Sequence, residues 1–592
     1  LDPENTHKQD WPDAMTTTVR EEGVEVHYKI ADPMMHDTLV GVFEGVNPAL
    51  DKITSWMGGP AKLLREMVTR MPDFIIANTT RDAIVTWINH GTSKTPINAV
   101  SNSMHRLIAD TLERSHGRLS KTHKDLKRTA VLGGIENKDF TSENITKSTV
   151  KEIMGEKDVS KLLTRAWDFM GEMSNTGEGV ARERVFEKTF EEAYESLRGQ
   201  GLSVKEAEQH AMGEAGFQAK EILNFSRRGA NPFLKFLTAT IPFLNARIQG
   251  LDVFARNALS GTNIHRADSK VARAALWKRG AYIAGMTAIY AAINWDDEEY
   301  KSQSMHVREG NWLFTPFGWV IAVPIPFEAG IVFKTIPEHA VRLLMGESSD
   351  ELMEAVGHAA MQTLQFNLLP QAVKPMVEGA TGVNFFTGQS IVPYYQQNLK
   401  PELQYGDKTS AVARLVEKAV PDWLPGGESV TPYIVDNTLR GYFGSAATYA
   451  LAASDAILHN PMFGFTSENT DKMLVERPLV RRFFKDGIGP ANEQAYWSLV
   501  KELDGVTASL RVLSKQDPKK AIEYRKSNQE IMELASVIRE TGKMMSQLRD
   551  LDTQIKNSQT MTGAQKQSSR RVIKERKAKL LSLYPELKRR VG

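Results

Sequence analysis

Ten lysines and arginines lie between Lys566 and Gly592, where only Glu575 and Glu586 oppose them. Cations at this density attract a polyanion, whether DNA or anionic lipid headgroups. Tyr584 is the single aromatic residue among them, so base stacking is not indicated. A solvated helix face is the alternative explanation of the run. The candidate polyanion-binding residues are Arg570, Arg571, Lys574, Arg576, Lys577, Lys579, Lys588, Arg589 and Arg590.

The stretch from Asn231 to Glu299 sorts its charge along the chain. A basic amphipathic segment comes first, an uncharged run from Gly280 to Asn294 follows, and four consecutive acids close it. The uncharged run is shorter than the roughly 17–25 residues of a spanning helix, so we expect membrane contact without a clear span. A proline-kinked core helix and a buried bundle helix are the alternatives. The candidate membrane residues are Phe233, Phe236, Leu237, Ile241, Leu244, Ile248, Tyr282, Ile283 and Ile289.

No enzyme signature is found in the sequence. The chain has no cysteine, which excludes disulfides, thiolate metal sites and cysteine nucleophiles. Gly382–Ser390 (GVNFFTGQS) is superficially similar to a phosphate loop, but its glycine spacing is one residue too long and Gln389 stands where lysine is needed. We therefore expect no catalytic, cofactor or metal site in this chain.

The length of 592 residues predicts several domains. The apolar content of 41% and charged content of 25% are typical of folded protein, and the net charge of +2 means that any polyanion affinity must come from local patches. The chain begins at Leu1 and not at methionine, so we expect a processed product or part of something longer. The predicted domains are a helical domain with a short strand (1–125), a charged helical connector (126–228), the amphipathic region (229–300), a mixed helical and irregular arm (301–470) and a helical hairpin with a basic tail (471–592).

The periodicity of apolar residues predicts a mainly α-helical fold with one or two short β segments. Residues 24–30 alternate like a strand, whereas residues 34–118 and 160–225 have helical spacing. The aromatic, proline-punctuated stretch from Trp312 to Pro326 favours short strands or extended loops. We expect residues 369–430 to form an irregular arm. Two apolar stripes separated by Asp517-Pro518 predict an antiparallel helical hairpin at the C-terminus.

Several stretches, in this order along the chain, resemble phage large polyvalent proteins and the internal virion proteins of short-tailed phages (podoviruses). No single stretch is specific, but the ordered set is. The stretches are 25–33, 72–82, 231–256, 324–338, 370–393 and 409–414.

The resemblance implies a virion protein that is packed near the portal and ejected ahead of the genome. Such proteins rebuild into a conduit for DNA across the host periplasm and inner membrane. The implied partners are copies of the same chain in a ring, other ejection proteins, the portal, genomic DNA and the host inner membrane. Members often carry an enzymatic domain elsewhere in a longer chain, for example a lytic transglycosylase, and we find no such domain here. The alternatives are the non-catalytic scaffold of a polyvalent enzyme delivered with the genome, and a DNA-binding protein of the virion core.

Overall fold

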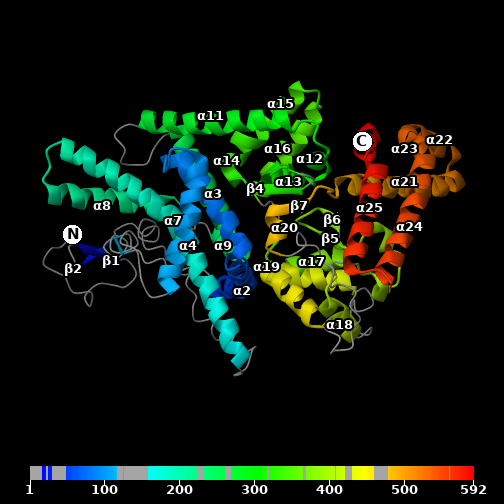
Figure 1. Cartoon of the computed structure of the whole chain (residues 1–592), viewed down its shortest axis with the longest axis horizontal. Helices are drawn as coiled ribbons and strands as arrows, with labels where there is room; N and C mark the ends of the chain where they lie inside the picture. The colour runs from blue at the N-terminus through cyan, green and yellow to red at the C-terminus, as the bar shows by residue number, and fades with distance from the viewer. Residues whose placement is uncertain are drawn as a thin grey trace. The chain divides into compact units, whose positions relative to one another are not determined.

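The computed structural model has an almost entirely helical architecture with a few short strands, which confirms the predicted fold class (Figure 1). It describes residues 16–21, 24–29, 48–115, 124–125, 158–222, 232–260, 269–316, 319–364, 369–406, 409–420, 430–458, 478–558 and 560–591. Two compact units are present. The first comprises Leu1–Ala292, Pro324–Pro375 and Tyr442–Ala446, and the second comprises Ile293–Val323, Met376–Gly441 and Ala447–Gly592. Of the charged connector predicted at 126–228, residues 126–157 and 223–228 lie outside the described residues.

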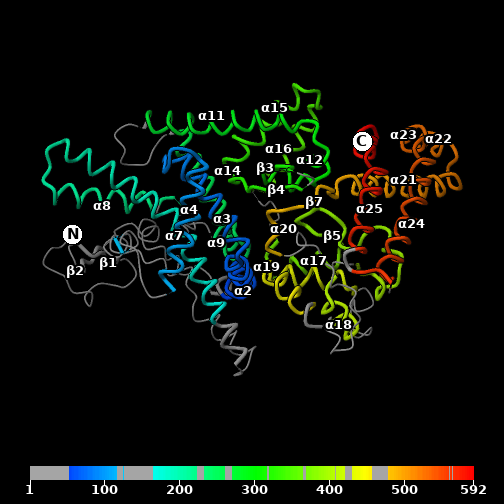
Figure 2. The backbone as a smooth tube through the Cα atoms, viewed as in Figure 1, coloured from blue at the N-terminus to red at the C-terminus, as the bar shows by residue number. Residues whose placement is uncertain are grey.

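The first unit is built on a bundle of three helices. They are α3 (Pro72–His90), α4 (Pro96–Ser115) and α7 (Asp158–Gly199), which meet in a core of Ile75, Leu107 and Val180. Helix α8 (Val204–Glu221) begins at a capping box formed by Ser203 and Glu206, and it folds back along α7 (Figure 2). The remaining elements of this unit are β1 (Thr16–Glu21), β2 (Val24–Lys29), α2 (Pro48–Thr69), α9 (Pro232–Thr240), α10 (Leu244–Ala255), the π-helix η3 (Arg256–Ser260), α11 (Ser269–Ile293), α14 (Phe327–Gly330), the π-helix η5 (Ile331–Thr335), α15 (Ile336–Leu344) and α16 (Ser349–Leu364).

The second unit contains a small sheet and a helical bundle. The sheet has the order β3 (Asn311–Phe314), β4 (Trp319–Pro324) and β7 (Phe484–Asp486), and β7 runs antiparallel to β4 with Trp319 opposite Asp486. Its other elements are α12 (Glu298–Ser302), α13 (Met305–Gly310), α17 (Lys374–Thr381), β5 (Val383–Asn384), β6 (Gln389–Ser390), η6 (Tyr394–Gln396), η7 (Pro401–Leu403), α18 (Ala411–Ala419), α19 (Pro432–Leu458), α20 (Val480–Phe483), α21 (Ala491–Gln516), α22 (Pro518–Ser527), α23 (Gln529–Glu533), α24 (Ala535–Asn557), α25 (Gly563–Leu581) and α26 (Tyr584–Val591). The strands expected between Trp312 and Pro326 are therefore present.

The C-terminal bundle has more helices than the predicted hairpin. Helices α21 and α24 supply the two expected apolar stripes, and the chain breaks at Asp517-Pro518 as predicted. The stretch read as a basic tail forms α25 and α26, which pack against these helices. The core of the bundle consists of Ala495, Tyr496, Leu499, Leu503, Val506, Ile531, Ala535, Ile538, Met545, Leu581 and Tyr584. The basic stretch is thus a structural part of the bundle.

Candidate functional site

The candidate membrane residues of the segment 231–260 divide between core and surface. Leu237, Ile241 and Leu244 are buried and form a small core cluster, against which Phe236 packs. Phe233 and Ile248 are exposed. The helix breaks after Thr240, and Phe243 takes a left-handed conformation with φ of 63° before α10 begins. This part of the segment is mainly a kinked core element, as the alternative explanation predicted for it.

Helix α11 has one face in the core and another in solvent. Leu276, Gly280 and Ile283 are buried, and the ring of Phe333 lies so close to Gly280 that a β-carbon there would overlap it. Tyr282, Met286 and Ile289 are 49%, 51% and 58% exposed. The exposed positions from Ala281 to Ala292 carry no charge, whereas the exposed positions of the first turns include cations. Those cations are Lys270, Arg273 and Lys278.

Other arginines of the stretch from Asn231 to Glu299 bind groups within the protein. Arg279 donates to the carbonyl oxygens of Ile88 at 2.7 Å and Asn89 at 2.9 Å, and so closes the C-terminal end of α3. Arg256 pairs with Glu221 at 3.3 Å. Among the described residues, no helix is long and apolar enough to cross a membrane.

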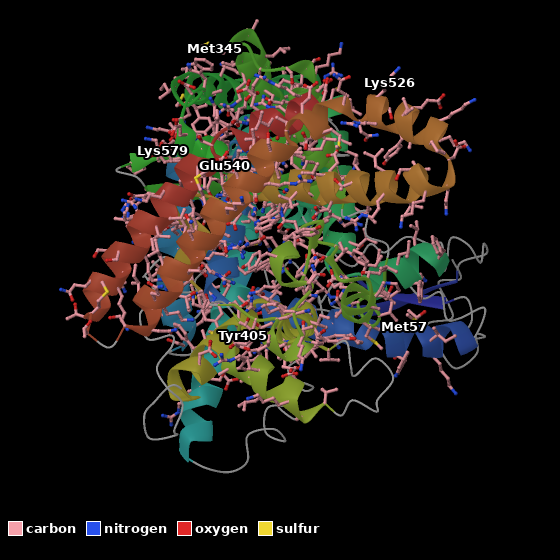
Figure 3. All side chains as sticks on the ribbon, turned by 90° about the vertical axis from the view of Figure 1, so that its right-hand side faces the viewer. Met57, Met345, Tyr405, Lys526, Glu540 and Lys579 are labelled. Carbon is pink, nitrogen blue, oxygen red and sulfur yellow. The ribbon has the colours of Figure 1, made fainter. Side chains whose placement is uncertain are left out.

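The predicted polyanion-binding residues lie on α25 and α26 and fall into two groups. Several are paired with acids of the second unit: Arg570 with Asp552 at 2.9 Å, Lys574 with Asp486 of β7 at 2.6 Å, Arg571 with Glu575 at 3.2 Å and Arg590 with Glu586 at 2.7 Å. Burial lowers the pKa of Lys577. The exposed remainder comprises Arg576, Lys579, Lys588 and Arg589, and Figure 3 labels Lys579 on α25.

The stretch from Gly382 to Ser390 forms a β-hairpin and not a phosphate loop. Strands β5 and β6 pair antiparallel, and the side-chain oxygen of Asn384 accepts the backbone N–H groups of Phe386 and Thr387, each at 3.0 Å. The carboxylate of Glu378 accepts the N–H of Phe385 at 2.8 Å. Backbone donors that a phosphate would need are therefore engaged, and a carboxylate lies beside them.

A cavity of about 840 Å³ lies within the first unit, and no pattern in the sequence predicted it. Its walls come from α2, α3, α7, α10 and the start of α14. A volume of this size is typical of small-molecule sites. The charged lining residues are Lys62, Arg65, Glu66, Arg70, Arg81, Asp82, Glu178, Arg247 and Glu328.

Two arginines of the cavity wall hold the backbone around α14. The guanidinium groups of Arg81 and Arg247 lie over the ring of Phe327, at 4.4 Å and 4.9 Å from its centroid. Arg81 Nε donates to the carbonyl oxygen of Ile325 at 3.0 Å. Arg247 Nη1 donates to the carbonyl oxygen of Thr363 at 2.8 Å and to that of Gln362. Burial lowers the pKa of Arg247 to about 10.

Besides Glu66 on α2, which pairs with Arg70, three carboxylates from three other helices line this cavity. Asp82 on α3 accepts one hydrogen bond, from Asn78 Nδ2 at 2.8 Å. Burial, followed by the charge of Glu178 on α7, raises the pKa of Asp82 from 3.8 to about 7, and Glu328 on α14 adds to the effect. Burial also raises the pKa of Glu328, against the opposing charges of Arg247 and Arg81. The site therefore combines a carboxyl group that titrates near neutrality with two further acids.

The close approach of Glu328 to α10 depends on a glycine. A β-carbon at Gly250 would overlap the Glu328 carboxylate, so any larger residue there would displace it. Three of the stretches that carried the family resemblance, 72–82, 231–256 and 324–338, supply Asp82, Arg247 and Glu328 to the same cavity. That convergence was the one signal in the sequence that could have located the site. No group of three or more His, Cys, Asp or Glu residues able to hold a metal ion occurs in the described part of the chain.

Comparison with known proteins identifies one part of the chain. No curated protein and no solved structure gives a significant match. Residues 297–480 match the family described as Large polyvalent protein associated domain 38. The matched range includes the sheet strands β3 and β4, the Phe327–Glu328 wall of the cavity and helix α19. The match supports the expected relation to phage polyvalent proteins for this range, which is similar to a large polyvalent protein associated domain.

Proposed function

We propose that the chain is a non-catalytic internal virion protein of a phage, delivered into the host with the genome, and that α11 attaches it to the host inner membrane. The observation that carries the membrane role is the exposed face of α11, which is uncharged from Ala281 to Ala292 and follows a cationic beginning. The domain match at 297–480 supports the phage polyvalent class. The absence of cysteine suits a chain threaded through a narrow tail, because no disulfide can close a loop.

The proposed membrane contact is interfacial. An amphipathic helix lies in the plane of the interface with its apolar face in the acyl boundary and its cations near anionic headgroups. Tyr282, Met286 and Ile289 are about half exposed, so inserting each of them would contribute about 1 kcal/mol. Cations near an anionic surface add about 1 kcal/mol each. Together these contributions favour reversible attachment, in keeping with the finding that no described helix could cross a membrane.

The proposal extends to assembly and location. The chain would be held in the virion interior as a ring of copies, together with other ejection proteins and the portal, around the genomic DNA. After ejection it would occupy the host periplasm and inner membrane as part of a DNA conduit. A DNA-binding role in the virion core is the second candidate, which the exposed cations of α25 and α26 favour. A non-catalytic region of a longer polyvalent protein is the third, and the domain match favours it.

The membrane role is tested by replacing Ile289 with aspartate. We expect the Ile289→Asp variant to bind vesicles containing anionic lipid about tenfold more weakly, because it loses an apolar side chain and places an acid against anionic headgroups. Cosedimentation with vesicles measures this, and the melting temperature should not change, since Ile289 is 58% exposed. Val204→Asp on α8 is the matched control, because Val204 is 55% exposed and lies outside this face. Failure of the wild-type protein to cosediment with anionic vesicles would refute the proposed contact.

The class of protein is tested in phage particles. We expect the chain to be present in purified virions and to leave them when ejection is triggered, as measured by quantitative mass spectrometry of full and emptied particles. Retention in emptied capsids together with the DNA-packaging machinery would favour the virion-core role. Absence from the virion would refute both particle roles and leave the polyvalent scaffold.

A further inference from the structure

We infer that the exposed face of α16 in one copy of the chain binds the exposed face of α25 in a second copy. Each face belongs to one compact unit, α16 to the first and α25 to the second. The two faces would be the surfaces that join neighbouring copies in the proposed ring, so the inference rests on that part of the proposed function.

Helix α16 exposes large apolar side chains that its packing in the core does not require. Its inner face is made of small residues, since Ala355 and Ala359 are 0% and 5% exposed. On the opposite side, Met353 and Met361 are 69% and 61% exposed. Gly357 lies between them, and a β-carbon there would meet no atom within 4 Å, so the backbone of another helix can approach closely. Methionine side chains adapt to the shape of a partner, and this face is therefore suited to a helix.

The charge around the α16 face determines which partner fits it. No lysine or arginine occurs from Leu343 to Val373, whereas four acids do. Two of them, Asp350 and Glu354, are exposed on the same face as the methionines. Acids repel DNA and anionic lipid headgroups, so neither of these partners fits. A cationic amphipathic helix does fit, because it offers apolar side chains to the methionines and cations to the acids.

Helix α25 presents such a face in the second unit. Val572, Arg576 and Lys579 are exposed along one side of the helix, and Leu583 follows directly after its end. Val572 and Leu583 are 47% and 66% exposed, although the opposite side of the helix supplies Leu581 to the core of the bundle. The α25 face therefore has apolar side chains at its two ends and two cations between them.

The α16 and α25 faces have the same spacing along the chain. Their exposed positions are 350, 354, 357 and 361 on α16, and 572, 576, 579 and 583 on α25. Positions at i, i+4, i+7 and i+11 lie on one side of a helix and span roughly 16 Å. When the two faces are aligned in either direction, Glu354 falls opposite Arg576 or Lys579, and Met361 falls opposite an apolar end of the α25 face. Neither these three charged residues nor Asp350 forms an ion pair with another described residue, so each is available to a second copy.

The contact is heterologous, because it joins different surfaces of the two copies. Such a contact adds copies head to tail and closes into a ring when the rotation between neighbours returns to the first copy. Two faces of this length bury little area beside the roughly 1,600 Å² of a standard interface. Exposed charges are also screened by salt. A single contact is therefore weak, and association falls as the salt concentration rises.

Sedimentation velocity of the full-length chain, at increasing protein concentration and low salt, tests the inference by charge reversal. We expect the wild type to associate, and we expect Asp350→Lys/Glu354→Lys and Arg576→Glu/Lys579→Glu each to associate at least about tenfold more weakly, because each variant brings like charges together. Lys519→Glu/Lys526→Glu is the matched control, since it reverses two exposed cations on α22 of the second unit. Figure 3 labels Lys579 and Lys526.

Mixing the two reversed variants distinguishes a lost contact from a folding defect. An equimolar mixture of the α16 variant and the α25 variant should recover wild-type association, because each reversed face then meets an oppositely charged face in the other variant. Failure of the mixture to recover, or an equal loss in the α22 control, would overturn the inference.

Two further outcomes separate the inference from the proposed function. Wild-type association that neither reversed variant weakens would overturn the α16 and α25 contact and leave the ring of copies standing. A wild-type chain that does not associate at any concentration would overturn both the contact and the ring. Presence of the chain in purified virions is measured separately and does not depend on either result.

Discussion

Asp82→Asn should stabilise the first unit at alkaline pH and lose that advantage in acid. The carboxyl group of Asp82 has its pKa raised from 3.8 to about 7, first by burial and then by Glu178. The folded unit therefore binds this proton more tightly than the unfolded chain does. The cost of ionised Asp82 is fully present above about pH 7 and is lost as the pH falls toward about 4. Asparagine has the same shape, can still accept from Asn78, and carries no charge at either pH.

The size of the effect follows from the difference between the two pKa values. At about 1.4 kcal/mol for each pH unit, that difference sets a ceiling of about 4 kcal/mol on the free energy that ionised Asp82 costs the fold. The carboxylate faces a cavity large enough to admit water, and water reduces the cost of the charge. We therefore expect Asp82→Asn to raise the free energy of unfolding by about 1–2 kcal/mol near pH 8 and by nearly nothing near pH 3, where the carboxyl group is protonated in both the folded and the unfolded chain.

Hydrogen exchange is the assay that reports on this unit alone. Amide protection of α3 and α7, measured by mass spectrometry in wild type and Asp82→Asn, gives the free energy of opening of the first unit without interference from the second. Asp168→Asn controls for the loss of one surface charge. Equal changes in protection at both pH values, or lower protection of the variant near pH 8, would show that burial and Glu178 do not raise the pKa of Asp82.

Two further predictions concern charges elsewhere in the chain. Glu338→Ala should destabilise the first unit by about 3–5 kcal/mol, because it leaves the buried cations of Lys334 and Arg342, which lie 2.9 Å and 3.3 Å from Glu338, without their common partner. Chemical denaturation measures this loss, and Glu354→Gln, at an exposed position of α16, is the control. A loss below about 1 kcal/mol would contradict the prediction. Replacing exposed cations of α25 and α26 by glutamine should reduce the slope of log DNA affinity against log salt concentration by about 0.9 for each phosphate that is no longer neutralised. Filter binding measures this slope, and the melting temperature should not change. An unaltered slope would mean that these cations form only a solvated helix face. The cations to replace are Arg576, Lys579 and Lys588.

Local patterns predicted most elements of this fold, because helices and strands are decided over a few residues. The alternation at Val24–Lys29 predicted β2, although its partner β1, with the sequence TTTVRE, was missed for want of apolar alternation. The many cations between Lys566 and Gly592 obscured the pattern of two structural helices, α25 and α26. Ile573 and Leu581 on α25 and Tyr584 on α26 lie among the cations in the sequence and are buried, yet the charge run dominated the pattern.

The cavity could not be predicted from local patterns. Its acids lie at positions 66, 82, 178 and 328, and each one has the local pattern of an ordinary polar residue of a helix. Only the packing of α3, α7, α10 and α14 brings them to a common space. The physical cause of the raised pKa of Asp82, its removal from solvent, is a tertiary property and has no counterpart in sequence spacing.

Helix α11 shows why two interpretations of one sequence can both be partly right. Its run of small residues is compatible with close packing in a bundle and with membrane contact. In the structure, Gly280 receives the Phe333 ring on one face, while Tyr282 and Ile289 remain exposed on another. Because a helix turns through about 100° per residue, the two demands fall on different residues of the same run. Packing in the core therefore explains Gly280. It does not explain why the exposed face is apolar, and contact with a partner surface would explain that.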